Sequence, residues 1–287
     1  MDSESSLEAR IAASMAQSSP KQKQLARFVL GNRYLVSFAS ASQVGQTVGA
    51  SAATVVRFAQ SLGYAGFSEL QEAIRKELPT YLSAVDRIQK RLDAPLPTDG
   101  IPQRVFHADI KNIQRTAASL SEAEFNAALD KIVKARRIMV VGSGLSSAPA
   151  IFLAHSLRVI GFSAQEAIDG GLFQAVNAAQ LGTGMLLIAI DLWRYARSTV
   201  EAVHTAKRQG ASVITISDSI VSPMAQVADH AFAVVTDGVS HSLSLTAVIS
   251  LLNGIIAALS YRAPEQTMES LRRVDAAYRT GNLLLTE

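Results

Sequence analysis

Residues 41–64 read Ala-Ser-Gln-Val-Gly-Gln-Thr-Val-Gly-Ala-Ser-Ala-Ala-Thr-Val-Val-Arg-Phe-Ala-Gln-Ser-Leu-Gly-Tyr, and this stretch predicts two short helices that meet at Gly49. Ser51 can cap the second helix, because its side chain can accept a hydrogen bond from a backbone N–H of the first turn. Gly63 supplies a residue that adopts the left-handed conformation with which helices often end. We therefore expect the second helix to span residues 52–62.

The two faces of this predicted helix differ in character. Its buried face follows the i, i+3, i+4, i+7 spacing and consists of Val55, Phe58, Ala59 and Leu62. Its exposed stripe then consists of small or hydrogen-bonding residues and one arginine: Ala53, Thr54, Arg57, Gln60 and Ser61. Such a stripe suits a helix that enters the DNA major groove, which is about 12 Å wide. An ordinary amphipathic helical hairpin shows the same spacing and remains an alternative.

Charge is unevenly distributed along the chain. The segment 21–67 contains no Asp or Glu and carries five basic residues, Lys21, Lys23, Arg27, Arg33 and Arg57, although the net charge of the whole chain is only +3. This local excess favours contact with DNA phosphates, for which Lys21 and Lys23 are candidates together with Ser51 at the helix cap. A solvated basic surface without a partner is the alternative.

Composition limits the class of protein. The chain has 287 residues, of which 48% are hydrophobic and 18% charged, so it is not generally disordered and is long enough for more than one domain. Cysteine is absent, which excludes disulfides and thiolate metal sites. We identify no signal peptide, and the apolar stretch 247–259 is shorter than the roughly 20 residues that span a bilayer. A cytoplasmic protein without membrane contact is expected.

Prolines mark the predicted domain boundary. Four of the eight prolines lie between residues 79 and 102, which indicates a linker. Upstream, Ser19 and Pro20 are typical of a helix start, and Ser68 with Gln71 predicts a capping box for a helix that ends near Leu78. We therefore expect an all-α domain over residues 1–78, a linker over 79–107 and a second domain over 108–287.

The second domain alternates apolar strands with helices. Strands are predicted at residues 137–141, 185–190, 212–216 and 231–235, with a weaker one at 162–167, and helices at about 144–160, 197–209, 222–228 and 242–260. Ser121 with Glu124 and Ser222 with Pro223 are expected to begin helices. Alternation of this kind predicts a parallel sheet covered by helices on both faces.

A glycine-rich turn follows the first predicted strand. It reads Gly142-Ser143-Gly144-Leu145-Ser146-Ser147, and ligands of open parallel sheets bind beyond the carboxyl ends of the strands. Glycines let the backbone approach a ligand, and the N–H groups of the following helix favour anions. The turn has neither the third glycine of a dinucleotide motif nor the lysine of a P-loop, so a simple tight turn is the alternative.

Two of these segments resemble a known family. Residues 52–70 resemble the helix-turn-helix of RpiR-family bacterial transcriptional regulators, and Gly142-x-Gly144-x-Ser146 with its αβ pattern resembles the sugar isomerase (SIS) domain that this family carries. The resemblance implies an all-α helix-turn-helix domain followed by an α/β SIS domain. It implies a ligand-responsive DNA-binding protein whose SIS domain senses a phosphorylated sugar and dimerises, with ligand contacts at Gly142, Ser143, Gly144, Ser146 and Ser147.

A second loop of the SIS pattern departs from the family. The family form is Ser-x-Ser-Gly-x-Thr, whereas residues 191–196 read Asp-Leu-Trp-Arg-Tyr-Ala in register, which predicts that the small-hydroxyl cradle is lost. Asp191 would repel a phosphate, while Arg194 and Arg197 could hold an acidic group by forked hydrogen bonds. We therefore expect a ligand with an acid for an arginine and a donor for Asp191. A loop that only packs or contacts a subunit is the alternative.

No catalytic residue, metal site or cofactor is predicted. His155 lies in a largely apolar segment, and the spacing of His204 from Glu201 is typical of a surface pair. His230 and His241 have no companion at metal-ligand spacing. The favoured function is a regulator that binds double-stranded operator DNA and a small anionic metabolite as a homodimer or homotetramer. Two alternatives stay open: an SIS-type sugar-phosphate isomerase with a helical appendage, and a constitutive DNA-binding protein with a degenerate SIS domain. The long apolar segment 243–260 is a candidate subunit contact, although burial within one chain explains it equally well.

Overall fold

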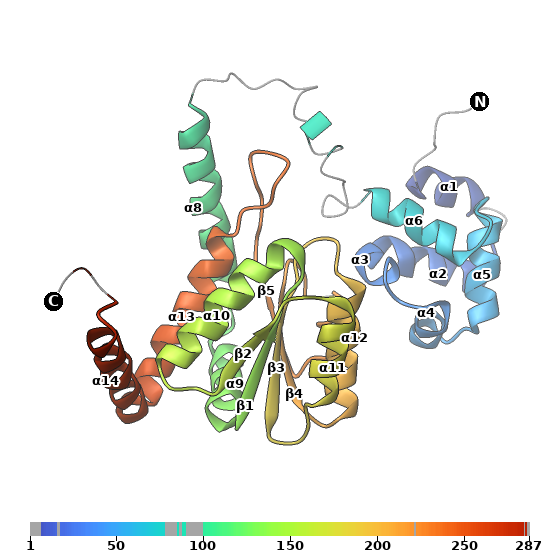
Figure 1. Cartoon of the computed structure of the whole chain (residues 1–287). Coiled ribbons are helices and arrows are strands. Elements are labelled where there is room, and N and C mark those ends of the chain that lie inside the picture. The colour runs from blue at the N-terminus through green and yellow to red at the C-terminus, as the bar shows by residue number, and fades with distance from the viewer. Residues whose placement is uncertain are drawn as a thin grey trace. The chain divides into compact units, whose positions relative to one another are not determined.

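The computed structural model describes residues 7–15, 18–77, 85, 88–89, 100–220, 222–283 and 285. The chain divides into two compact units, with the boundary in the sequence between Lys90 and Arg91 (Figure 1). Most of the predicted linker lies outside the described residues. Residues 101–107 at its carboxyl end belong to the helix α8 (Ile101–Ser119).

The first unit is all helical, as predicted. Its helices are α1 (Leu7–Ser14), α2 (Pro20–Gly31), α3 (Arg33–Val36), α4 (Ala41–Val48), α5 (Ala52–Ser61) and α6 (Phe67–Glu77). Ser19 caps α2 in a capping box with Gln22, which confirms the predicted helix start at Pro20. Apolar side chains from all six helices enclose one core, in which Leu25, Val29 and Phe58 are almost fully buried.

The predicted capping box of Ser68 and Gln71 is wrong. Helix α6 begins at Phe67, two residues before Glu69, where this box requires the helix to begin. The Gln71 amide instead donates hydrogen bonds to the carbonyl oxygens of Val36 and Ala39, each over 2.8 Å. Gln71 therefore ties α6 to the end of α3, a long-range contact that local sequence spacing does not reveal.

The second unit is a parallel sheet with helices on both faces (Figure 1). Its strands β1 (Arg137–Val141), β2 (Ala164–Ala167), β3 (Met185–Ile190), β4 (Ser212–Ser217) and β5 (His230–Ala233) lie in the order β2-β1-β3-β4-β5. Its helices are α8, α9 (Glu122–Lys134), α10 (Ser147–Val159), α11 (Gly171–Ala179), α12 (Arg197–Arg208), α13 (Thr246–Arg262) and α14 (Pro264–Thr280). The predicted fold class is confirmed.

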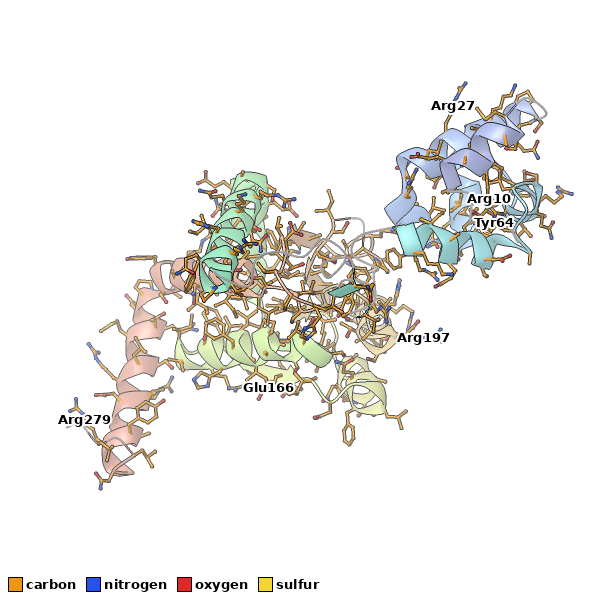
Figure 2. All side chains as sticks on the ribbon, turned by 90° about the horizontal axis from the view of Figure 1, so that it is seen from above. Arg10, Arg27, Tyr64, Glu166, Arg197 and Arg279 are labelled. Carbon is orange, nitrogen blue, oxygen red and sulfur yellow. The ribbon has the colours of Figure 1, made fainter. Side chains whose placement is uncertain are left out.

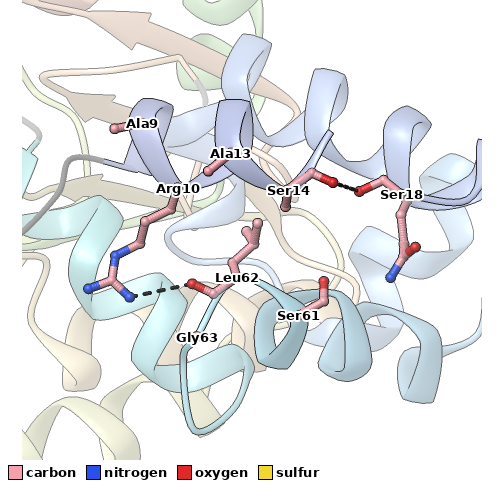
Figure 3. A pocket seen from close by; sticks show the side chains of 9 residues that line it. Ala9, Arg10, Ala13, Ser14, Ser18, Ser61, Leu62 and Gly63 are labelled. Carbon is pink, nitrogen blue, oxygen red and sulfur yellow. Dashed lines mark hydrogen bonds between the residues drawn. The ribbon is translucent and has the colours of Figure 1, made fainter. Parts of the chain in front are cut away.

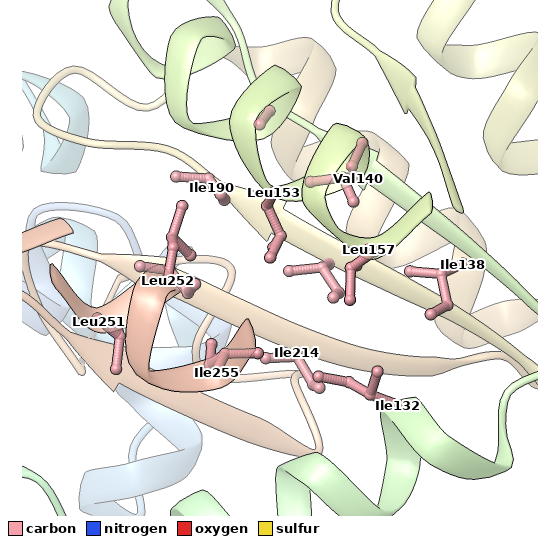
Figure 4. Close-up of a cluster of buried hydrophobic side chains, with 14 of the residues drawn as sticks. Ile132, Ile138, Val140, Leu153, Leu157, Ile190, Ile214, Leu251, Leu252 and Ile255 are labelled. Atoms are coloured by element: carbon pink, nitrogen blue, oxygen red, sulfur yellow. The ribbon is translucent and has the colours of Figure 1, made fainter. Parts of the chain in front are cut away.

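Each face of the sheet has its own hydrophobic core. On one face, Ile138, Val140 and Ile214 pack against side chains of α9, α10 and α13 (Figure 4). On the other face, strand residues such as Met139 and Leu187 pack against α12. Alternate strand residues face opposite sides of a sheet, so continuously apolar strands are needed to fill both cores.

Helix α13 lies largely inside the first of these cores. Val248, Leu252 and Leu259 are fully buried there, so burial within the chain accounts for much of the apolar segment 243–260. Among the described residues no single helix is long and apolar enough to cross a membrane. Only α13 and α14 taken together reach that length and composition, across a bend of 107°.

In the second unit, one predicted helix is wrong and three are missed. Residues 223–227 form turns, although Ser222 and Pro223 are typical of a helix start. Few residues separate this start from β5, and Met224 is fully buried in the second core, so tertiary packing replaces the helix. Helices α8, α11 and α14 were not predicted. The cap predicted at Ser121 is confirmed, since its side chain accepts a hydrogen bond from Glu124 N.

Candidate functional site

The predicted two-helix element is present as α4 and α5. Ser40 caps α4, and the left-handed Gly49, with a φ of 64°, ends it. The Ser51 side chain then accepts a hydrogen bond from Thr54 N and caps α5, and Gly63 follows the helix with a φ of 87°. The caps predicted at Ser51 and Gly63 are thereby confirmed.

A glycine that the sequence analysis did not single out lets these helices meet. A Cβ atom at Gly45 would lie 2.5 Å from the carbonyl oxygen of Ala50. The backbone N–H of Ala50 donates to the carbonyl oxygen of Gly45 over 2.7 Å, so the turn between the helices folds directly onto α4. Only a residue without a side chain fits at this contact.

The faces of α5 are those expected. Val55, Phe58, Ala59 and Leu62 are between 0% and 5% exposed, whereas Ala53, Arg57, Gln60 and Ser61 are exposed and Thr54 is half-buried. Three polar members of this stripe also form local hydrogen bonds. Thr54 shares one with Ser51, and the Ser61 hydroxyl donates to the carbonyl oxygen of Phe58. Gln60 Nε2 donates to the carbonyl oxygen of Ala65 over 3.4 Å. Arg57 stands on the solvent side of a rigid, capped helix.

The structure changes the interpretation of the basic segment. Lys21 Nζ donates to the carbonyl oxygen of Val48 over 3.0 Å, at the end of α4. Arg33 forms an ion pair with Glu8 of α1, an acid that lies outside the acid-free segment. Arg27 is exposed, and Figure 2 shows its side chain directed away from the unit. Part of the predicted excess charge therefore serves the internal structure of the first unit.

Helix α1 and the end of α5 border a hollow of about 600 Å³ (Figure 3). Arg10 crosses it, because its Nη1 donates to the carbonyl oxygen of Leu62 over 3.4 Å and its guanidinium lies 4.9 Å from the centre of the Tyr64 ring. The sequence analysis did not identify Arg10. Its contacts hold the carboxyl end of α5 against α1.

A second site lies where the strand order of the sheet reverses. Strand β1 pairs with β2 on one side and with β3 on the other, so chain connections leave the sheet in opposite directions at this point. Loops after β1 and β3 flank such a switch point, and ligands of open α/β sheets bind there. The loops concerned, residues 142–146 and 191–196, are the two that the sequence analysis singled out.

Glycines shape the loop after β1. A Cβ atom at Gly142 would lie 2.3 Å from the carbonyl oxygen of Ser146, and Gly144 has a φ of 56°. The Ser146 side chain is 1% exposed and accepts a hydrogen bond from Leu192 N, which ties the two loops together. The Ser147 hydroxyl donates to the carbonyl oxygen of Gly144. The hydroxyls of Ser146 and Ser147, two of the predicted ligand contacts, thus also maintain the shape of the loop.

Hydroxyl groups from outside residues 191–196 lie beside the loop after β1. Ser143 Oγ lies 3.0 Å from Thr199 Oγ1 and 3.5 Å from Ser198 Oγ. Helix α12 begins only at Arg197, so its first turn supplies hydroxyls that an in-register comparison of residues 191–196 does not reach. A Cβ atom at Gly170, in the loop after β2, would also lie within 3.9 Å of Ser198 Oγ.

Gln174 contacts the loop after β1 and is a residue that the sequence analysis missed. It lies on α11 and is fully buried, and its Nε2 donates to Ser143 Oγ over 3.2 Å and to the carbonyl oxygen of Ala167 over 3.1 Å. A polar residue inside the apolar run of α11 was the available signal. It went unused because that segment was not recognised as a helix.

Asp191 is buried at the bottom of the loop after β3, with 3% of its surface exposed. Its Oδ2 accepts a hydrogen bond from Ala196 N over 2.8 Å. Burial raises the pKa of Asp191 to about 7, and hydrogen bonds from Ala196, Thr199 and Leu192 only partly offset this effect. Perturbed groups of this kind gather at functional sites.

The rest of this loop is polar and strained. Trp193 has a φ of 66°, a conformation that costs a bulky residue about 1–3 kcal/mol. The guanidinium of Arg194 lies 5.3 Å from the centre of the Trp193 ring, and the Tyr195 hydroxyl donates to Asp218. Arg194 and Arg197 are both exposed, and Figure 2 labels Arg197 at the edge of its unit. The two arginines are therefore accessible rather than buried.

The structure gives other polar residues a place outside this pocket. His230 Nδ1 lies 2.8 Å from Glu124 Oε1, so this histidine links β5 to α9. Within the part of the chain that the structure describes, no three His, Asp or Glu side chains are grouped as a metal site requires.

Comparison with known proteins identifies both domains. Residues 5–80 match the family described as helix-turn-helix domain, rpiR family, and residues 131–257 match the SIS domain. An uncharacterized HTH-type transcriptional regulator of Haemophilus influenzae is 28% identical over 73% of each chain. The HTH-type transcriptional regulator HexR of Pseudomonas aeruginosa is 25% identical over 71% of this chain and 70% of its own.

Solved structures extend the likeness. The sugar isomerase domain of an RpiR transcription factor from Sphaerobacter thermophilus is 36% identical, with a TM-score of 0.60, and covers 61% of this chain and 98% of its own. The Vibrio vulnificus NanR protein complexed with ManNAc-6P covers 98% of this chain and 100% of its own with a TM-score of 0.68, and at 21% identity it shows a shared fold. With its capped α4–α5 element and its two switch-point loops, the chain belongs to the RpiR family of transcriptional regulators.

Proposed function

We propose that this regulator binds operator DNA through α5 and that a small anionic metabolite in the switch-point pocket alters its DNA affinity. The metabolite belongs to the sugar-phosphate or sugar-acid class. The protein acts in the cytoplasm as a homodimer or homotetramer. The observation that carries the proposal is Arg57, exposed on a capped helix whose opposite face is buried.

The base-reading role of α5 follows from its surface. Ala53 and Gln60, which are exposed, and Thr54, which is half-buried, leave room for close approach and offer hydrogen-bonding groups. Arg57 can donate two parallel hydrogen bonds to a guanine. Lys23, Arg27 and Ser51 then serve as phosphate contacts around this helix. Lys21 stays a candidate for the same role, although its Nζ already donates to Val48.

Operator binding tests this proposal. Fragments selected from genomic DNA by the full chain supply the operator, and its affinity is then measured at several salt concentrations. Arg57→Ala should lose about 1–3 kcal/mol of binding free energy and relax specificity at one base position, because a base contact is removed. Lys23→Ala is the matched control, since loss of a phosphate contact weakens all sequences alike and lowers the salt slope by about one. Unchanged operator binding by Arg57→Ala would contradict a reading role for α5.

Ligand binding at the pocket needs a separate measurement. The NanR structure holds ManNAc-6P, which makes phosphorylated amino sugars a natural part of a panel together with sugar acids and amino acids. A compound that binds only the folded protein raises its melting temperature, by an amount that grows with concentration. The effector should also shift operator affinity. A constitutive regulator would show neither effect.

One observation favours a second candidate function, sugar-phosphate isomerisation. The pKa of about 7 of Asp191 is near the optimum for a general base, and the carboxyl lies within the pocket. An isomerase would exchange the hydrogen next to the substrate carbonyl with deuterium from solvent, which proton NMR detects. Exchange that disappears in Asp191→Asn would support this function.

A further inference from the structure

A chain of hydrogen bonds links α11, the loops at the switch point and the first turn of α12. Gln174 Nε2 donates to Ser143 Oγ over 3.2 Å, and Ser143 Oγ lies 3.0 Å from Thr199 Oγ1. The Thr199 side chain is in turn hydrogen-bonded to the Asp191 carboxyl. An amide N–H only donates, and the Asp191 carboxyl only accepts once it is ionised, so above about pH 7 the two ends fix the direction. Ser143 therefore donates to Thr199, and Thr199 donates to Asp191.

This chain ends at the N-terminus of α12. Asp191 Oδ2 also accepts the N–H of Ala196, the residue that precedes the helix. Helix N-termini attract anions because their first N–H groups are not used within the helix and the helix dipole is positive there. In this protein the Asp191 carboxylate occupies that place, and it also accepts a hydrogen bond from the Thr199 hydroxyl.

The other end of the Gln174 amide, its Oε1 atom, is a hydrogen-bond acceptor without a donor among the described residues. Gln174 is fully buried, and its Oε1 accepts no hydrogen bond from any residue that the structure describes. A buried carbonyl oxygen without a donor costs free energy, which a ligand hydroxyl would recover. Gln174 Oε1 and the Asp191 carboxylate are both acceptors, so the inner part of the pocket is built to receive donors.

We propose that Asp191 is a resident anion at the N-terminus of α12, so that a hydroxyl-bearing end of the effector enters this corner and a phosphate is excluded from it. The inference rests on the proposed function only in taking this pocket as the effector site. Asp218 adds a second negative charge close to Asp191. The acidic group of the effector then faces the exposed guanidinium groups of Arg194 and Arg197.

Inorganic phosphate is the probe that tests this arrangement. Calorimetry on the full chain at about pH 8, where Asp191 is ionised, should show no saturable phosphate binding by the parent. Asp191→Ser and Asp191→Asn remove the resident charge, and each should bind phosphate at least about tenfold more tightly than the parent. The Asn variant keeps an oxygen that can accept from Ala196 and Thr199, so it preserves the loop.

Asp169→Asn is the matched control, because it removes one negative charge from the exposed loop after β2 without touching the hydrogen-bond chain. It should gain no phosphate affinity. Tight phosphate binding by the parent, an equal gain in the Asp169 variant, or no gain in folded Asp191 variants would each overturn the proposal. Failure of the proposed function itself would appear in operator binding, which this calorimetry does not measure.

Discussion

Burial of the Asp191 carboxyl makes the stability of the protein depend on pH. Its folded-state pKa rises from an ordinary 3.8 to about 7, so the folded protein binds this proton more tightly than the unfolded chain does. Stability from this group is full below the unfolded pKa and is lost as the pH rises through the folded pKa. The loss amounts to about 4 kcal/mol above about pH 7.

Asp191→Asn should remove this dependence. The free energy of unfolding of the parent, measured by urea between about pH 5 and about pH 8, should fall relative to that of the variant as the pH rises. Glu166 and Asp229 do not interfere, because their pKa values are lowered and they titrate below this range. Parallel curves for the two proteins would show that the carboxyl is not held in a protonation-sensitive site.

Lys21 illustrates how a residue can fit a pattern and yet have another task. Its position in an acid-free segment suggested a phosphate contact, whereas its Nζ lies against the carbonyl oxygen of Val48. The last carbonyls of a helix have no partner within the helix and carry the negative end of its dipole, so a cation there is stabilising. Lys23 and Arg27 are therefore clearer candidates than Lys21 for contact with DNA phosphates.

At the scale of an element, the turn between α4 and α5 depends on Gly45. Alanine within a helix is normally more stable than glycine by about 0.5–1 kcal/mol. A Cβ at this position, however, would meet the carbonyl oxygen of Ala50 at 2.5 Å, and a backbone atom cannot move aside cheaply. We expect Gly45→Ala to destabilise the first unit by about 1–3 kcal/mol and to weaken operator binding.

Gly31→Ala is the control for this prediction. Gly31 ends α2, and a Cβ there would meet nothing within 4 Å. Its unfolding free energy and operator affinity should stay close to those of the parent, or its stability should rise slightly. Equal behaviour of the two variants in urea unfolding and DNA binding would show that the turn can relax around a side chain.

At the scale of the whole molecule, apolar side chains of α8 and α11 remain exposed outside the hydrophobic cores. Leu172, Phe173 and Val176 of α11 are between 63% and 84% exposed, and Phe106 of α8 is 67% exposed. Exposed apolar groups gathered on one helix often mark a contact with another chain. These exposed side chains replace α13 as the candidate subunit contact, because α13 is largely buried within its own unit.

We expect the full chain to form a dimer or a higher oligomer. A single recognition helix seldom supplies enough discrimination, whereas two helices about one DNA turn apart read a near-palindromic site. Light scattering should give a mass of at least twice 30.6 kDa at micromolar concentration. A species of 30.6 kDa alone, with and without operator DNA, would contradict this expectation.

Local sequence determined the elements whose signals act over a few residues. The caps at Ser19, Ser51 and Ser121 form as predicted, because each needs only a side chain and a backbone N–H three residues away. The β1 and β3 boundaries also match, since a continuous apolar run suffices to place a strand that is buried on both faces. The resemblance of residues 52–70 and of the glycine-rich turn to known motifs then indicated the family.

Tertiary structure alone decided the contacts that join distant segments. Gln71 reaches the carbonyls of Val36 and Ala39 instead of capping its own helix, and the helix predicted at residues 222–228 yields to packing around Met224. In the pocket, Ser143 meets Thr199 across 56 residues of sequence. Their proximity follows from the strand order at the switch point, and long-range packing, not residue spacing, sets that order.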